Sequence, residues 1–130
     1  MDKNEFSRTR HYLGKTQSQL ARLLCLSPKA VQSFEEGWRN IPVYVERQLL
    51  LLLSLRSTET KELKPCWETR NCPLEWRNNC IVWEYKSVYF CWLISGTFCQ
   101  GQFQNTWAQK IKFCRQCTVF QSMLPSLLAQ

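Results

Sequence analysis

Seven of the eight cysteines of this 130-residue chain lie in its second half, where their thiols could bind a metal. Only Cys114 and Cys117 form a C-x-x-C pair, the spacing that lets one turn present two sulfurs to a single ion. The only histidine is His11, so a metal site in the second half would use sulfur with at most an occasional oxygen. All-thiolate sites suit zinc or an iron–sulfur cluster. The candidate ligands are Cys66, Cys72, Cys80, Cys91, Cys99, Cys114 and Cys117.

Other interpretations of these thiols are a reduced structural core, disulfides and catalysis. Seven thiols divide neither into disulfides nor into four-ligand sites without remainder. A cysteine nucleophile needs a base, and His11 lies in the other half, so we expect no enzyme. The charged N-terminus is unlike a signal peptide, and the apolar run Leu49–Leu53 is far shorter than the roughly 20 residues that span a bilayer. We therefore expect a cytoplasmic protein with no membrane partner, where cysteine clusters are more often metal sites than disulfides.

The surroundings of the cysteines predict a small, irregular α+β domain stabilised by metal. The stretches CWETRNC (66–72), NCPLEW and SGTFCQG are rich in turn-forming residues, which is typical of ligand loops. The aromatic stretch SVYFCWLI (87–94) favours a strand. Thr106, followed three residues later by glutamine, predicts the start of a short helix over 106–114. Five tryptophans would supply the core of so small a domain; they are Trp67, Trp76, Trp83, Trp92 and Trp107.

The first half of the chain carries the capping pattern of a helix-turn-helix in KTQSQLARLLCLSPKAVQSFEEG. Thr16 is an N-cap with glutamine three residues later, which makes a capping box. Ser27 caps the next helix, Pro28 suits its first position and Gly37 suits its end. Two helices joined by so short a turn form the unit that places its second helix in a DNA major groove.

The polar face of that second helix predicts contacts with base edges. Lys29 can bind guanine and Gln32 can bind adenine in the major groove. Gln17 begins the preceding helix, where a side chain and free N–H groups can hold a phosphate. The candidate DNA-binding residues are Gln17, Ser18, Ser27, Pro28, Lys29, Gln32, Ser33, Arg39 and Asn40.

Residues 5–56 resemble the Xre/Cro family of helix-turn-helix domains, the fold of lambdoid phage repressors. The matching stretches are TQSQLA, LSPKAVQSFEEG and the following IP. The resemblance implies an all-α, lambda-repressor-like bundle, with Gln17 on a phosphate and Pro28, Lys29, Gln32 and Ser33 facing the bases. One departure is a cysteine at position 25, where the family usually has glycine. That turn position often takes a left-handed conformation, so we expect a turn residue there and no metal ligand.

Residues 65–120 resemble the cysteine- and tryptophan-rich "two-CW" domain that is fused to such helix-turn-helix modules in anaerobic bacteria. The matching stretches are PCWETRNC, CWLISGTFCQG and CRQCTVF. The resemblance implies metal or cluster binding without fixing which. One departure is Ile81, where proline would be expected after the cysteine.

A leucine-rich segment and a charged segment separate the two halves. VYVERQLLLLLSLRS predicts one more helix that ends near Ser57, and its leucines exceed what one small domain needs, which favours a homodimer on palindromic half-sites. The stretch STETKELK predicts the boundary. The expected domains are a DNA-binding domain (1–57), a linker (58–64), a cysteine/tryptophan-rich domain (65–120) and a tail or short helix (121–130).

The net charge of +7 fits a polyanionic partner such as double-stranded DNA. The sequence therefore predicts a sequence-specific transcriptional regulator whose second domain binds zinc or an iron–sulfur cluster and senses redox or metal state. The alternative is an antitoxin-like interaction module with a protein partner, autoregulatory DNA binding and purely structural cysteines.

Overall fold

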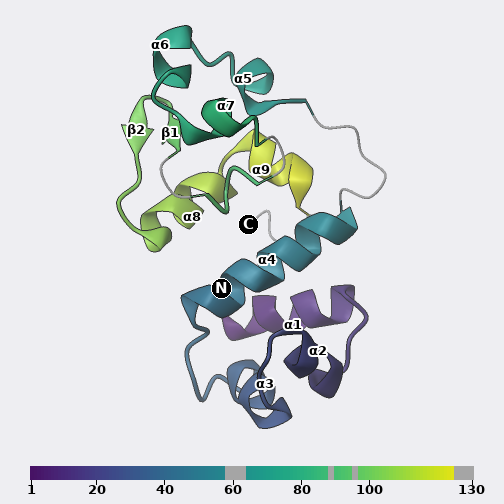
Figure 1. Cartoon of the computed structure of the whole chain (residues 1–130). Helices are drawn as coiled ribbons and strands as arrows, with labels where there is room; N and C mark the ends of the chain where they lie inside the picture. The colour runs from purple at the N-terminus through teal and green to yellow at the C-terminus, as the bar shows by residue number, and fades with distance from the viewer. Residues whose placement is uncertain (58–63, 88–89, 95–96, 125–130) are drawn as a thin grey trace. The chain divides into compact units, whose positions relative to one another are not determined.

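The chain divides into two compact units, Met1–Arg56 and Ser57–Gln130, in a computed structural model (Figure 1). Most of the expected linker and most of the expected C-terminal tail lie outside the described residues. No helix of the described part is both long enough and apolar enough to cross a bilayer. The structure describes residues 1–57, 64–87, 90–94 and 97–124.

The first unit is built from helices, as the sequence predicts. A helix that the sequence pattern did not single out opens the chain, and the side chain of its N-cap, Asp2, accepts a hydrogen bond from the Glu5 amide at 2.8 Å. The described helices of this unit are α1 (Lys3–Tyr12), α2 (Gln17–Leu23), α3 (Pro28–Glu35) and α4 (Val43–Ser57).

The predicted caps of α2 and α3 are confirmed. Thr16 Oγ1 accepts the amide of Gln19 at 3.1 Å, and the Gln19 side chain accepts the Thr16 amide at 3.0 Å, which completes the capping box. Ser27 Oγ accepts the amide of Ala30 at 3.1 Å, with proline at the first helical position. Cys25 lies in the turn with φ 55°, the left-handed conformation expected at that position. These local interactions hold α2 and α3 in a fixed relation.

An apolar core and polar ties join the helices of this unit. Phe6 of α1 meets Phe34 of α3 edge to face, with ring centroids 5.7 Å apart. Arg10 forms a salt bridge with Glu35 and so joins the same two helices. Helix α4 packs against α1, where the guanidinium of Arg56 lies over the Tyr12 ring. The fully buried core side chains include Phe6, Leu20, Val31, Val45, Leu49 and Leu53.

The second unit combines short helices with a two-stranded hairpin, and the predicted α+β class is confirmed at that level. The predicted helix from Thr106 is present: Thr106 Oγ1 accepts the amide of Gln109 at 3.2 Å. The described elements are α5 (Cys66–Thr69), α6 (Leu74–Arg77), α7 (Ile81–Tyr85), β1 (Phe98–Cys99), β2 (Gln102–Phe103), α8 (Trp107–Arg115) and α9 (Thr118–Met123).

The strand predicted over residues 87–94 is not found in residues 90–94, and residues 88 and 89 lie outside the described part. The amides of Leu93 and Ile94 both bond back to the Phe90 carbonyl, at 2.9 and 3.3 Å, which makes a turn. Trp92 is fully buried there and meets Phe120 of α9 edge to face at 6.5 Å. The aromatic composition correctly indicated burial, but the backbone satisfies its hydrogen bonds locally and not through a neighbouring strand.

Two residues with positive φ connect β1 to β2, Gln100 at 52° and Gly101 at 75°. Two such residues form the type I′ turn, whose twist matches that of the flanking strands. Phe98 and Phe103 face each other across the strands with ring centroids 4.6 Å apart. A Cβ at Gly101 would lie 3.1 Å from the Trp76 ring, so the turn packs directly on that indole.

Candidate functional site

The predicted DNA-binding residues lie on α2, on α3 and in the loop that follows. Gln17 is the first residue of α2 and is half-buried. Helix α3 exposes its first two residues and one further polar position to solvent. The exposed members of the predicted set are Ser18, Ser27, Pro28, Lys29, Gln32, Arg39 and Asn40.

Ser33 was predicted to face the bases, but its side chain is buried. Its side chain is 7% exposed, and its hydroxyl donates to the Ala30 carbonyl at 2.6 Å. Position 33 falls on the inner face of α3, next to Phe34, so the hydroxyl bonds within its own helix and is not presented to a base.

Two long polar side chains are left on the outer face of α3. Lys29 and Gln32 lie three residues apart, a spacing that puts both on one side of a helix. The hydroxyl of Ser27 is already engaged in capping, and Pro28 offers only apolar contact. Beyond the helix, the guanidinium of Arg39 lies 5.3 Å from the Phe34 ring centroid, which anchors this basic side chain beside α3.

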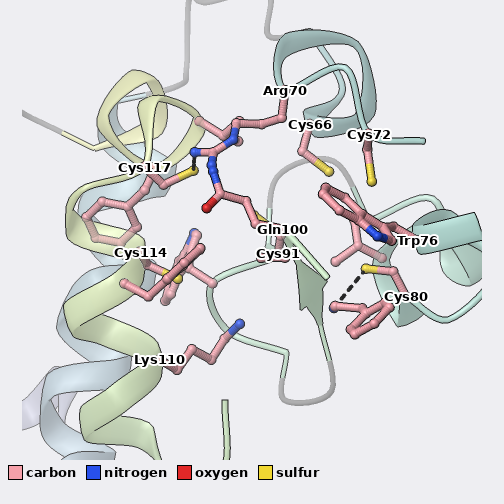
Figure 2. A pocket seen from close by; sticks show the side chains of 17 residues that line it. Cys66, Arg70, Cys72, Trp76, Cys80, Cys91, Gln100, Lys110, Cys114 and Cys117 are labelled. Atoms are coloured by element: carbon pink, nitrogen blue, oxygen red, sulfur yellow. Dashed lines mark hydrogen bonds between the residues drawn. The ribbon is translucent and has the colours of Figure 1, made fainter. Parts of the chain in front are cut away.

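All seven cysteines of the second unit line one cavity of about 80 Å³. Figure 2 shows the labelled cysteines around this hollow together with Arg70, Trp76, Gln100 and Lys110. Sequence analysis proposed these thiols from residue type alone, and the structure brings them together. Cys25 belongs to the other unit and is exposed.

Short helices on one side of the cavity position three of the thiols. Cys66 is the first residue of α5, and Cys80 is the N-cap of α7. Cys72 precedes Pro73, which is the N-cap of α6. The sulfur of Cys80 accepts a hydrogen bond from the Phe98 amide at 3.4 Å, so the start of β1 is tied to this side.

The other thiols come from the hairpin, the turn before it and the last two helices. Cys99 lies in β1 and Cys91 in the turn at residues 91–94. Cys114 is buried in the last turn of α8, and Cys117 is the N-cap of α9. As predicted, the C-x-x-C pair therefore spans a helix terminus and the turn after it. Arg70 Nη1 donates to the Cys117 sulfur at 3.2 Å across the cavity.

The sulfurs surround the cavity without converging on one point. In the described part of the chain, no three cysteine, histidine or acidic side chains lie close enough together to hold one ion as placed. All eight cysteines are free thiols. A single metal ion would therefore be held only after some of the thiols move together.

Burial raises the pKa of five of the seven thiols and so favours their protonated form when no metal is bound. It raises the pKa of Cys66 from 9.0 to about 12, and the charges of neighbouring cysteines raise it as well. Burial raises the pKa of Cys114 to about 11, against the lowering effect of Lys110. A bound metal would have to displace these protons, because the thiolate is the ligand. Burial also raises the pKa of three further thiols, which are Cys72, Cys91 and Cys99.

Lys110 is a buried cation at this cavity that the sequence did not reveal. It is 4% exposed, and its ammonium group donates to Thr97 Oγ1 at 2.8 Å. Its charge lowers the pKa of Cys91, Cys99 and Cys114 against the effect of burial. Its enclosure comes from the packing of α8, which no local sequence pattern encodes.

Trp92 is another residue that lies beside the thiols and carries a buried polar group. Its ring is fully buried and lines the same cavity. Its indole N–H finds no hydrogen-bond partner among the described residues. The prediction that tryptophans form the core fits Trp92, whereas Trp67 and Trp83 are half-buried and meet edge to face at 5.0 Å.

The chain matches no family model, and no curated protein or solved structure shows significant similarity to it.

Proposed function

We propose that this protein is a sequence-specific DNA-binding regulator whose second unit binds a metal ion or an iron–sulfur cluster through cysteine thiolates. The gathering of seven thiols around one cavity carries the metal-binding part of this proposal. The capped α2–turn–α3 unit carries the DNA-binding part, with Lys29 and Gln32 as the residues that contact bases.

Cationic side chains at the cavity and the absence of histidine from the second half of the sequence support an anionic, all-sulfur centre. Zinc and iron–sulfur clusters are both bound by four cysteines, and such sites carry net negative charge. Lys110 and Arg70 line the cavity and supply compensating positive charge. When bound, the metal would cross-link short helices that are too small to be stable on their own.

We extend the proposal to a homodimer on a palindromic site. Two copies related by a two-fold axis would place two α3 helices on half-sites of the DNA. Three large apolar side chains of α4 are exposed and offer contact area, namely Val43 (48%), Tyr44 (54%) and Leu55 (54%). Sedimentation with and without operator DNA tests this point, and a single-chain mass in both would contradict it.

The central experiment compares DNA affinity across states of the thiol site. A duplex is first selected from a random-sequence pool by the full-length protein. Its affinity is then measured for metal-loaded, stripped and oxidised protein at one salt concentration, because such affinities depend strongly on salt. We expect selection of a short, related set of sequences and a severalfold change in affinity between states. Equal affinity in all states would mean that the metal has only a structural role. Failure to select any related set of sequences would contradict the DNA-binding part of the proposal.

A further inference from the structure

The cavity between the thiols is larger than a single metal ion requires. In a tetrahedral zinc site the Zn–S distance is about 2.3 Å, which brings the four sulfurs within about 3.8 Å of one another. Among the described residues, no three ligand side chains are placed so that they could hold a metal ion. The cavity of about 80 Å³ compares with roughly 10–15 Å³ for one water molecule on the same measure. It therefore has room for several atoms beyond its sulfurs.

Buried N–H groups at the cavity lack enough acceptors. The indole N–H of Trp92 has no partner in the described part of the chain, although such groups usually find one when buried. Lys110 has three N–H donors, and one hydrogen bond, to Thr97, is found for it among the described residues. At a zinc site the only new acceptors are the four thiolate sulfurs, which are also present at a cluster. The bridging sulfides of an iron–sulfur cluster are acceptors, and hydrogen bonds to sulfur tune such clusters.

The thiols that line the cavity belong to separate parts of the unit. Cys66, Cys72 and Cys80 come from the α5–α7 segment, while Cys114 and Cys117 come from α8 and α9 (Figure 2). A group with several metal atoms can take ligands from both sides, because each thiolate binds a different iron.

On these grounds, and resting on the proposed metal site, we propose that the cavity holds a polynuclear iron–sulfur cluster, with Lys110 as its buried counter-charge and Trp92 as an N–H donor. A cation next to a cluster favours the reduced state, which carries one more negative charge, and therefore raises the reduction potential. An N–H group that donates a hydrogen bond to a cluster sulfur also raises the reduction potential. The two residues then set the potential at which the site changes oxidation state.

Metal and sulfide analysis tests the identity of the group. Full-length protein is purified without oxygen and assayed for iron, acid-labile sulfide and zinc, with visible and electron paramagnetic resonance spectra. We expect a brown protein with iron and sulfide in similar amounts. Colourless protein with stoichiometric zinc would overturn this inference and leave the proposed metal site standing. Protein that contains neither iron nor zinc would overturn both this inference and the proposed metal site.

The roles of Lys110 and Trp92 are tested through the reduction potential and not through activity. Lys110→Gln removes the charge but can still bond to Thr97, and Trp92→Phe removes the N–H. Lys112→Gln is the matched control, because Lys112 is exposed on the same helix. We expect a lower midpoint potential in both variants and an unchanged one in the control.

Unchanged potentials in both variants would overturn the assigned roles. If Lys110→Gln fails to retain a cluster, Lys110→Arg, which keeps the positive charge, decides the matter. Retention of a cluster with a potential near that of the unaltered protein would support the counter-charge. Loss of the cluster in this variant as well would overturn the counter-charge role and leave Lys110 a packing residue.

Discussion

Gln32 and Ser33 are neighbours in α3, yet only the first is available to another molecule. Gln32 is exposed, whereas the Ser33 hydroxyl is buried and bonded to the Ala30 carbonyl. We expect Gln32→Ala to weaken binding to the selected duplex by about 1–3 kcal/mol, roughly 5- to 150-fold, through loss of a paired contact with a base.

Ser33→Ala is the adjacent control for that experiment. It removes a hydroxyl that faces the interior, so we expect DNA affinity to stay within about twofold of the unaltered protein. Fluorescence anisotropy with labelled duplex measures both variants. A large loss of affinity for Ser33→Ala with an intact fold would restore the original prediction for Ser33 and contradict the inner placement of its side chain.

The raised thiol pKa values predict that rising pH changes the stability of the metal-free protein and of the metal-loaded protein in opposite directions. In the stripped protein Cys66 has a pKa of about 12 and Cys114 of about 11, against 9.0 for an unperturbed thiol. Above about pH 9 the unfolded chain loses these protons while the folded one keeps them. The free energy of unfolding of the second unit should therefore fall from pH 9 to pH 11.

The loaded protein should behave differently at lower pH, because protons compete with the metal for the same sulfurs. Its stability should rise as pH increases through the acidic and neutral range. Urea unfolding followed by tryptophan fluorescence measures both forms. A stripped protein whose stability does not change between pH 9 and 11 would contradict the burial of these thiols. Cys25→Ser, which alters an exposed thiol of the other unit, should leave both profiles unchanged.

The hairpin that carries Cys99 depends on its two-residue turn. Gly101 has φ 75°, and a Cβ there would approach the Trp76 ring to 3.1 Å. We expect Gly101→Ala to destabilise the second unit by about 2 kcal/mol, from left-handed strain and displacement of the indole. Metal content should fall with it, since both Cys99 and Trp76 line the cavity.

Gln100→Gly is the matched change in the same turn. Gln100 already has φ 52°, so glycine relieves strain there but adds freedom to the unfolded chain. The two effects nearly cancel, and we expect a change within about 0.5 kcal/mol and full metal content. Thermal unfolding and metal analysis measure both variants. Equal stability of the two would contradict the turn geometry.

Three capped helices and the apolar helix α4 could be predicted from the sequence, whereas the capped helix α1 was missed and the short uncapped helices of the second unit could not be predicted. Thr16, Ser27 and Thr106 each cap a helix by a local hydrogen bond, so their residue types suffice to locate α2, α3 and α8. The helices α5, α6 and α7 have four or five residues and no side-chain cap bond. They depend on contacts with distant segments, which no local pattern encodes.

The same contrast between local residue types and contacts with distant segments applies to the candidate site. The seven thiols were identified by residue type, because sulfur chemistry is visible in a sequence. Lys110 and Trp92 were not placed at the cavity, because their role comes from the packing of α8 and of the turn at residues 91–94. Ser33 was misplaced because a serine on a short helix is equally compatible with the inner and the outer face.

For the whole molecule, the two units have different sources of stability. The first has an apolar core that includes Phe6, Leu20 and Val31, with capped helices. The second has short helices around a thiol-lined cavity, and we expect the bound group to add to its stability. Removal of the metal should therefore make the second unit less stable than the first without unfolding it, so that unfolding is not two-state.

The distribution of tryptophan allows this to be measured on the full-length chain. Five of the six tryptophans lie in residues 58–130, and Trp38 of the first unit is 67% exposed. Fluorescence therefore follows the second unit, while helical circular dichroism includes α1–α4. With a chelator present, the fluorescence transition should move to lower temperature by many degrees, since loss of a ligand that binds only the folded state removes several kcal/mol. A helical transition from the first unit should remain at its original temperature. If both signals instead shift together, the units unfold as one and the metal stabilises the DNA-binding helices as well.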